Sequence, residues 1–175
     1  MTLEERVGEL RVNPGVSGLR CSLSGREVPT GGFVKPIGLC GCCPAPGKPV
    51  LVEYDTTSVA GAWSTSLTEG EGLWRFAPLL PVLGVPREYA AEVGGTPVLP
   101  ARALGRARGL EVFVKNESAN PSGSFKDRGL AVAIALGWAC GARRFCLPTQ
   151  GNAGVAACLF SARLGLAGAL VYMPE

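Results

Sequence analysis

The segment Asn120-Pro-Ser-Gly-Ser-Phe-Lys-Asp-Arg-Gly129 indicates both the fold and the chemistry of this chain. Its proline and glycine favour a turn, after which a helix is expected to begin. Ser124 is a favoured helix cap, and Asp127, three residues further on, is predicted to complete a capping box. Lys126 then lies in the first helical turn, where the partial positive charge disfavours a protonated amine. Because a lysine must lose its proton to attack an aldehyde, Lys126 is a candidate Schiff-base nucleophile; the alternative is a solvated lysine beside a capped helix.

A second motif, Pro148-Thr-Gln-Gly-Asn-Ala-Gly154, joins the end of one predicted strand to the start of a predicted helix. In an open parallel sheet, loops at the carboxyl ends of strands line the ligand crevice. Gly151 allows a close approach of backbone to a ligand. The free N–H groups that follow Asn152 can receive a carboxylate or a phosphate. Asn152 itself offers a donor and an acceptor, although it could equally serve only as a helix cap.

Long apolar segments alternate with glycine-rich breaks from residue 95 onward, and they predict an α/β fold. The nearly continuous apolar strands predict burial on both faces, in a mostly parallel sheet with crossover helices. A ribbon-like segment is expected at 1–58, with a strand at Val50–Tyr54, and a connecting segment at 59–95, with short helices within 73–83 and 86–92. The catalytic region is expected at 96–175. Its predicted elements are strands at 111–115, 144–147 and 169–172 and helices at about 125–140 and 153–164.

Composition excludes several classes of protein. The chain has 175 residues, 47% of them hydrophobic, and a net charge of +3, which fits one domain or a domain with a small appendage. Its basic residues are scattered, so no nucleic-acid surface is expected. The apolar stretch 153–173 contains Arg163 and two glycines, which favours a helix, a turn and a strand over a membrane span. The start of the chain shows no secretory signal, so a cytoplasmic location is expected.

The seven cysteines are then expected to be free thiols or metal ligands rather than disulfides. Cys21 is followed by Ser24, where a second cysteine would complete a zinc knuckle, whereas Cys40 and Cys43 form a complete one. Cys42 could substitute, although adjacent cysteines rarely both face one ion. We therefore predict no metal site, with Cys21, Cys40 and Cys43 as the weak candidates, and a segment that folds without zinc. The remaining cysteines, Cys140, Cys146 and Cys158, are expected in the core.

Taken together, these motifs resemble the threonine synthase family, of pyridoxal-phosphate fold type II (tryptophan synthase beta-like). The segment around Lys126 is similar to that family's cofactor-lysine motif, and Gln150-Gly-Asn-Ala-Gly154 resembles its asparagine loop. The segments Leu19–Cys21 and Lys48–Asp55 resemble its amino-terminal ribbon. The other matching segments are Leu73–Pro81, Gly94–Pro97, Val114–Glu117 and Val171–Glu175.

The resemblance implies a role for each matching position. Lys126 would hold pyridoxal 5'-phosphate through a Schiff base and then move protons as a base. Phe125 would pack near the cofactor, and Asn152 would hydrogen-bond the cofactor's ring oxygen. The cofactor would serve as an electron sink. The residues implied in binding the substrate's α-carboxylate are Thr149, Gln150, Gly151, Asn152 and Ala153.

The reaction implied is the lyase conversion of O-phospho-L-homoserine and water to L-threonine and phosphate. The expected partner is therefore an amino-acid substrate, without nucleic acid or membrane; a homo-oligomer stays open. Gln150 departs from the pattern because a small hydroxyl residue is usual there. The sequence ends at Glu175 without the family's phosphate-binding glycine loop or the hydroxyl residue that faces the pyridine nitrogen, so the chain alone is expected to be inactive. The alternatives are a cysteate synthase, a serine or threonine dehydratase, or a non-catalytic fragment.

Overall fold

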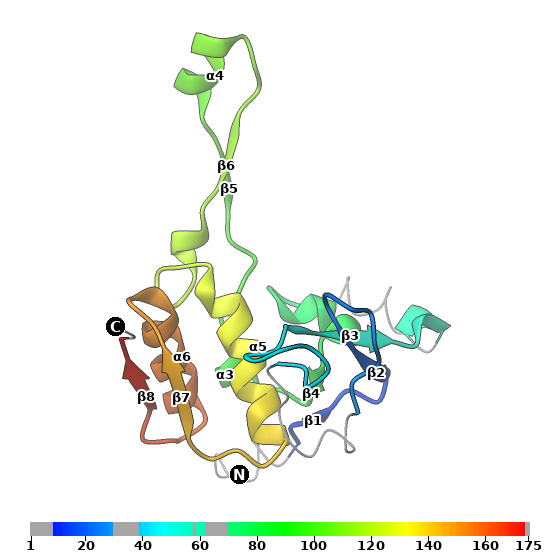
Figure 1. The fold of residues 1–175 in the computed structure, drawn as a ribbon. Coiled ribbons are helices and arrows are strands. Elements are labelled where there is room, and N and C mark those ends of the chain that lie inside the picture. The colour runs from blue at the N-terminus through cyan, green and yellow to red at the C-terminus, as the bar shows by residue number, and fades with distance from the viewer. Residues whose placement is uncertain (1–8, 30–38, 58, 62–69, 174–175) are drawn as a thin grey trace.

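The computed structural model of the chain describes residues 9–29, 39–57, 59–61 and 70–173. Two helices lie side by side at the centre, with one pair of strands on one side and further strand pairs on the other (Figure 1). The predicted landmark at 171–175 is described only as far as Met173. In the part of the chain described, every helix is too short or too polar to cross a membrane.

The central unit follows the predicted order of helices and strands. It consists of α5 (Lys126–Ala139), β7 (Phe145–Pro148), α6 (Asn152–Arg163) and β8 (Ala169–Tyr172). β7 and β8 pair in parallel, with Phe145 opposite Ala169 and Pro148 opposite Tyr172. Parallel neighbours require a crossover, and α6 supplies it. α5 ends where Gly141 adopts a left-handed conformation, with φ of 89°, which suits glycine after a helix.

Small side chains bring α5 and α6 together in the main core. Ala131 and Ala135 of α5 and Ala156 of α6 are fully buried, and Phe160 fills the space between them and the preceding segments. Arg163, which interrupts the apolar stretch in the sequence, has a structural use. Its guanidinium donates hydrogen bonds to the carbonyl oxygens of Tyr89, at 3.0 Å, and Ala91, at 2.9 Å. The end of α6 is thereby joined to the connecting segment.

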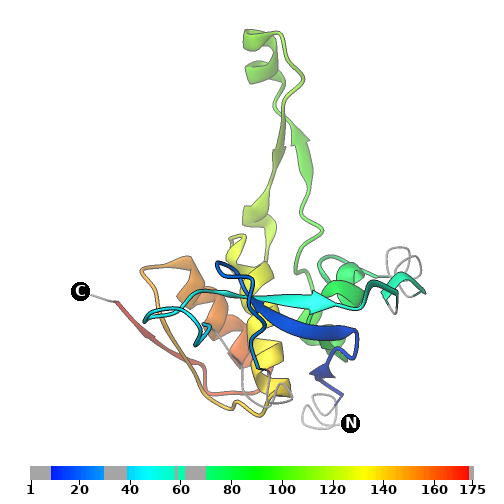
Figure 2. The same ribbon diagram turned by 45° about the vertical axis from the view of Figure 1, so that its right-hand side comes forward.

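A long arm extends from the end of the unit at which α5 begins (Figures 1 and 2). It is built from β5 (Val98–Pro100), α4 (Arg102–Arg108) and β6 (Phe113–Lys115), followed by the 3-10 turn η3 (Glu117–Ala119). β5 and β6 pair antiparallel because α4 and the left-handed turn at Gly109, with φ of 64°, reverse the chain between them.

The expectation of a mostly parallel sheet is therefore confirmed only at β7 and β8. Among the described residues, the other three strand pairs are antiparallel. Burial of the strands on both faces is wrong as well: Phe113 is 57% exposed and Leu170 is 68% exposed. The physical reason is that β5–β6 and β7–β8 are separate two-stranded sheets, so neither pair has strand neighbours beyond its partner among these residues.

The amino-terminal residues form an antiparallel pair with a small core of its own. β2 (Val16–Cys21) pairs with β3 (Val50–Tyr54), and the strand predicted at 50–54 is confirmed. Buried side chains gather on one side of this pair, and the ribbon-like character of the segment stays a prediction. These buried residues are Leu19, Cys21, Val28 and Cys40.

The connecting segment packs into the main core. It contains η2 (Trp74–Leu79), β4 (Val82–Leu83) and α3 (Arg87–Ala90), close to the two short helices predicted there. β4 pairs with β1 (Arg11–Val12), and Val82 is completely buried. Residues from before and after position 58 thus share one core, while the predicted division into segments stays a prediction.

Candidate functional site

Lys126 is the first residue of α5, as the sequence predicts, and its side chain is exposed. Its Nζ atom lies 4.7 Å from the centroid of the Phe125 ring, which is 57% exposed. Within the described part of the chain, this amine has no hydrogen bond or ion pair. A free amine beside an exposed aromatic face can react with a planar aldehyde that stacks there.

The capping box predicted between Ser124 and Asp127 is wrong. Phe125 occupies the cap position, and the Ser124 hydroxyl accepts a hydrogen bond from the N–H of Lys126 at 3.3 Å. The carboxylate of Asp127 instead accepts from the backbone N–H of Ser122 at 2.6 Å and from the Ser122 hydroxyl. The reason is the turn at Gly123, whose N–H donates to the carbonyl of Asn120 at 2.8 Å and whose φ is 81°. This turn places Ser122, rather than Ser124, against the fully buried Asp127.

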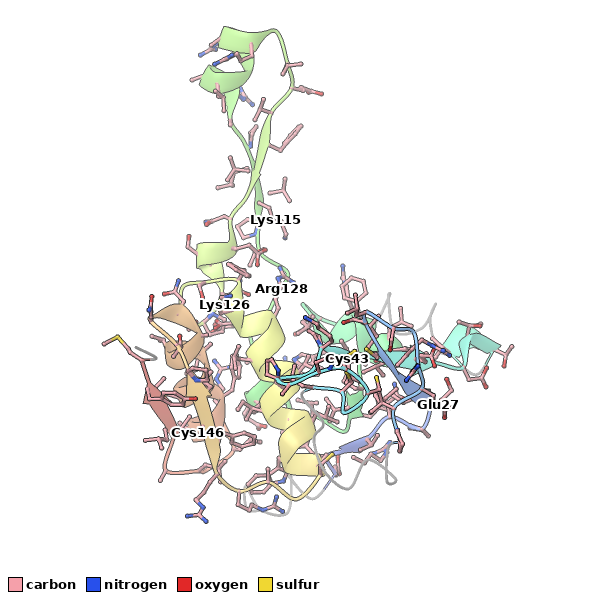
Figure 3. The ribbon with its side chains drawn as sticks, in the orientation of Figure 1. Glu27, Cys43, Lys115, Lys126, Arg128 and Cys146 are labelled. Atoms are coloured by element: carbon pink, nitrogen blue, oxygen red, sulfur yellow. The ribbon has the colours of Figure 1, made fainter. Side chains whose placement is uncertain are left out.

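A polar network joins the base of the arm to the first turn of α5, just after Lys126. Arg128 of α5 donates to both carboxylate oxygens of Glu117, at 2.8 Å each. Thr96 donates to Glu117 at 2.7 Å, and the amide of Asn120 donates to it at 3.1 Å. Lys115 donates to the carbonyl of Thr96. Figure 3 shows Lys115, Lys126 and Arg128 around this junction. The sequence motifs before the lysine segment therefore hold it in place.

We expect stability to depend on pH through Glu117. Hydrogen bonds from Arg128 and then Thr96 lower the pKa of Glu117 from 4.5 to about 2. A carboxyl whose folded-state pKa is depressed stabilises the fold above its unfolded pKa and loses that contribution as pH falls through its folded pKa. The wild-type chain should therefore unfold at higher urea than Glu117→Gln above about pH 5, and this gap should close toward about pH 2. Urea titrations across that range give the measurement, and a gap independent of pH would contradict the expectation.

The double glycine of the Gly94–Pro97 landmark supplies a second expectation. Gly94 has φ of 75°, and an added Cβ would lie 2.7 Å from the backbone nitrogen of Leu73. Gly95 has φ of 62°, but its nearest contact would be 3.4 Å away. Gly95→Ala should cost about 1 kcal/mol of unfolding free energy, from the left-handed conformation alone. Gly94→Ala should cost at least about 2 kcal/mol, because backbone must also move. Urea unfolding of the matched pair tests this, and equal losses would contradict it.

The asparagine loop lies between β7 and α6, as predicted. The structure places Gly151 at the cap position and Asn152 as the first helical residue, so the alternative that Asn152 is only the cap is wrong. Asn152 and Gln150 are exposed, and Thr149 accepts from the N–H of Gly151 at 3.2 Å. Among the described residues, the side chain of Asn152 makes no hydrogen bond. The N–H groups that open α6, including that of Ala153, lie at the positive end of the helix.

The two motifs lie at the same end of the molecule. α5 and α6 run side by side in the same direction, because each precedes a strand of the parallel pair, and both begin at the end from which the arm leaves (Figures 1 and 2). The fold thus brings the Lys126 amine, the exposed Phe125 ring and the loop 149–153 to one end of the helix pair. Among the residues that hold these groups in place, sequence reasoning identified Asp127, although with the wrong partner. It did not identify Thr96, Glu117, Asn120, Ser122 and Arg128, for which polar side chains within the family landmarks were the available signal.

The amino-terminal cysteines also come together, including one that was not among the candidates. The Sγ atoms of Cys21, Cys40, Cys42 and Cys43, here called the cysteine cluster, all lie within 4.8 Å of one another. Hydrogen bonds from Ser24 lower the pKa of Cys21 to about 5, whereas the neighbouring Cys21 sulfur and burial raise the pKa of Cys43 to about 12. Elsewhere, Cys140 and Cys158 are partly buried, and Cys146 is exposed, so the expectation of a core position is wrong for Cys146.

Comparisons with known proteins fit this geometry. Residues 89–175 match the family described as "Pyridoxal-phosphate dependent enzyme". The threonine synthase of Halalkalibacterium halodurans is 42% identical over 82 residues, covering 47% of this chain and 23% of that protein. That of Methanosarcina acetivorans is 33% identical over 116 residues, covering 66% and 28%. That of Methanocaldococcus jannaschii is 36% identical over 105 residues, covering 59% and 26%.

The matched region contains the lysine motif and the asparagine loop, and it is similar to pyridoxal-phosphate dependent enzymes. Within that class, the chain resembles part of the curated threonine synthases. It spans about a quarter of the length of these curated relatives. The expected cofactor, pyridoxal phosphate, is confirmed at the level of the family.

Proposed function

We propose that a protein carrying this chain converts O-phospho-L-homoserine and water to L-threonine and phosphate, with pyridoxal phosphate attached at Lys126. One observation carries the proposal. Lys126 and the exposed Asn152 are the first residues of α5 and α6, two parallel helices that begin at the same end of the molecule. Similarity to threonine synthases in this region supports the choice of reaction.

The residues at this end fit the cofactor chemically. The aldehyde of the cofactor needs an accessible primary amine, and Lys126 offers one that makes no hydrogen bond or ion pair with the described residues and lies over the Phe125 ring. A planar ring needs an apolar face, and the Phe125 ring is 57% exposed beside that amine. A ring oxygen needs a donor, and the amide of Asn152 provides one. When bound, the cofactor supplies an electron sink for negative charge at the substrate's α carbon.

Lys126 has two tasks under this proposal. Its Nζ would hold the cofactor and would also accept and return protons at the substrate's carbon atoms. The start of the helix suits both tasks, because it leaves the amine exposed beside the Phe125 ring. Asp127 and Arg128, one and two residues further along, restrict the motion of the backbone that carries Lys126 through their bonds to Ser122 and Glu117.

The loop 149–153 is proposed to bind the substrate's α-carboxylate. The first N–H groups of α6 are donors at the positive end of the helix, which is a favourable place for an anion. Thr149 supports the loop, since its hydroxyl accepts from Gly151 and its own N–H donates to the carbonyl of Tyr172 at 2.9 Å. Gln150 is exposed and adds an amide beside these N–H groups, where the family pattern has a small hydroxyl residue.

A test that separates this reaction from its rivals uses a protein that carries this chain, supplied with pyridoxal phosphate. We expect threonine and phosphate in equal amounts from O-phospho-L-homoserine, at roughly 1 per second or faster, and none from the Lys126→Ala variant. Formation of cysteate would instead indicate a cysteate synthase, and release of ammonia from serine or threonine would indicate a dehydratase. A protein that holds the cofactor at Lys126 yet yields none of these products would be a non-catalytic relative.

A further inference from the structure

The cysteine cluster has the dimensions of a site for a single metal ion. Its four sulfur atoms lie within 4.8 Å of one another, and those of Cys21 and Cys43 are 3.6 Å apart. A zinc ion at about 2.3 Å from each of four thiolates sets its sulfur atoms roughly 3.8 Å apart. A disulfide would need about 2.05 Å, and the described cysteines are all free. Contraction of the cluster by at most about 1 Å would therefore give tetrahedral coordination.

Backbone donors orient two of the sulfur atoms. The N–H of Ser24 donates to the Sγ atom of Cys21 at 3.4 Å, and the N–H of Lys48 donates to the Sγ atom of Cys40 at 3.4 Å. Such N–H groups outside the ligands fix the direction in which a metal-binding side chain points. Each donor follows its cysteine along the chain, and the two sulfur atoms that they contact both belong to the cysteine cluster.

Simple packing accounts for part of the cluster but not for Cys42. Cys21 and Cys40 are 1% and 4% exposed and belong to the small amino-terminal core, where cysteine is an ordinary apolar residue. Cys42 is exposed, so burial gives no reason for its sulfur to lie among the others. Its Sγ atom is 3.5 Å from the hydroxyl of Ser24, which occupies the position where a knuckle would carry its second cysteine.

We propose that the cysteine cluster binds one zinc ion through all four sulfur atoms, with Cys42 supplying the ligand that Ser24 does not. The turn at Cys21 then contributes one ligand and the segment Cys40–Cys43 contributes three. Four thiolates in a tetrahedron are the ligand set that zinc prefers in structural sites. The ion would join the end of β2 to the segment that leads into β3. This proposal replaces the expectation from the sequence that the segment folds without zinc.

Cobalt is the probe of choice, because tetrahedral cobalt thiolates absorb strongly in the visible region and zinc is silent. The purified chain should bind one equivalent of cobalt with this absorption, and zinc should displace it. Cys42→Ser should weaken zinc binding, measured by competition with a chelator, by at least about 10-fold. Cys146→Ser is the matched control, since Cys146 is an exposed cysteine of β7 outside the cluster (Figure 3), and it should bind zinc as the wild type does.

A second variant keeps the test decisive if Cys42→Ser folds poorly. Ser24→Cys placed in the Cys42→Ser background restores two complete knuckles, and it should recover the cobalt absorption and the affinity for zinc. Wild-type affinity in Cys42→Ser alone would overturn the role of Cys42. Absence of any cobalt–thiolate absorption in the reduced wild-type chain, or fewer than its seven thiols by titration without reductant, would overturn the metal site in favour of packing or a disulfide.

Discussion

Replacing Lys126 with alanine is expected to abolish covalent attachment of pyridoxal phosphate. The side chain is the amine at the start of α5 that lies free beside the exposed Phe125 ring. The cofactor's aldehyde requires an unprotonated primary amine, which alanine removes completely. The measurement is incubation with the cofactor, reduction with borohydride, digestion and mass mapping. The added mass should be found on the peptide that contains Lys126 and be absent from the variant.

Two further variants distinguish reaction at Lys126 from reaction with any exposed lysine. Lys126→Arg retains the positive charge but carries a guanidinium that is always protonated, so it should also lose attachment. Lys115→Ala removes an amine near the junction that is engaged with the carbonyl of Thr96, and it should leave attachment unchanged. Added mass on Lys115, or on any other lysine in the wild-type chain, would contradict the assignment. Because the readout is mass, it does not depend on turnover.

The central β–α–β unit could be predicted from the sequence because its local signals agree. The apolar runs of α5 and α6 are long enough for helices, and glycines follow each one. β8 was predicted with the bounds that the structure gives, Ala169–Tyr172, because a short apolar run stands alone between a glycine and a proline. The direction of the strands was harder to predict from the sequence. The apolar run that became β6 predicted a buried parallel strand, whereas the α4 reversal makes it antiparallel and leaves Val114 50% exposed.

The places of Lys126 at the start of α5 and of the loop 149–153 between β7 and α6 were predictable, because each belongs to one short segment; their roles stay predictions. Contacts between segments were not. Glu117, Thr96 and Arg128 meet through side chains from three parts of the sequence, and nothing local specifies that meeting. Cys42 was set aside because neighbouring residues usually point apart, yet the turn Cys40–Cys43 brings adjacent sulfur atoms to one centre. The capping box failed for a related reason, since the turn at Gly123 decides which serine faces Asp127.

Asp127→Ala is expected to be the most destabilising of the single substitutions made near Lys126. The Asp127 carboxylate is completely buried and accepts from the Ser122 backbone N–H at 2.6 Å and from the Ser122 hydroxyl. Hydrogen bonds to a charged group contribute about 1.5–3 kcal/mol each, and their loss would leave two part-buried donors of Ser122 without this acceptor. We expect a loss of roughly 3–5 kcal/mol in unfolding free energy, a large share of the 5–15 kcal/mol typical of a domain. Urea unfolding with both optical and hydrodynamic probes gives the measurement.

Two matched variants test whether the lost unfolding free energy comes from the Asp127–Ser122 hydrogen bonds rather than from a general effect at the start of the helix. Asp127→Asn keeps an acceptor for the Ser122 N–H and should fall between wild type and Asp127→Ala. Ser122→Ala removes only the hydroxyl and should cost about 1–2 kcal/mol. The double variant Asp127→Ala/Ser122→Ala should lose less unfolding free energy than the sum of the losses in the two single variants, because both single changes remove the same hydrogen bond. An Asp127→Ala chain within about 0.5 kcal/mol of the wild type would show that the carboxylate does not hold this turn. The turn would then be set by the Asn120–Gly123 hydrogen bond alone, and the immobility that we attribute to the Lys126 backbone would have to come from Arg128 and Glu117.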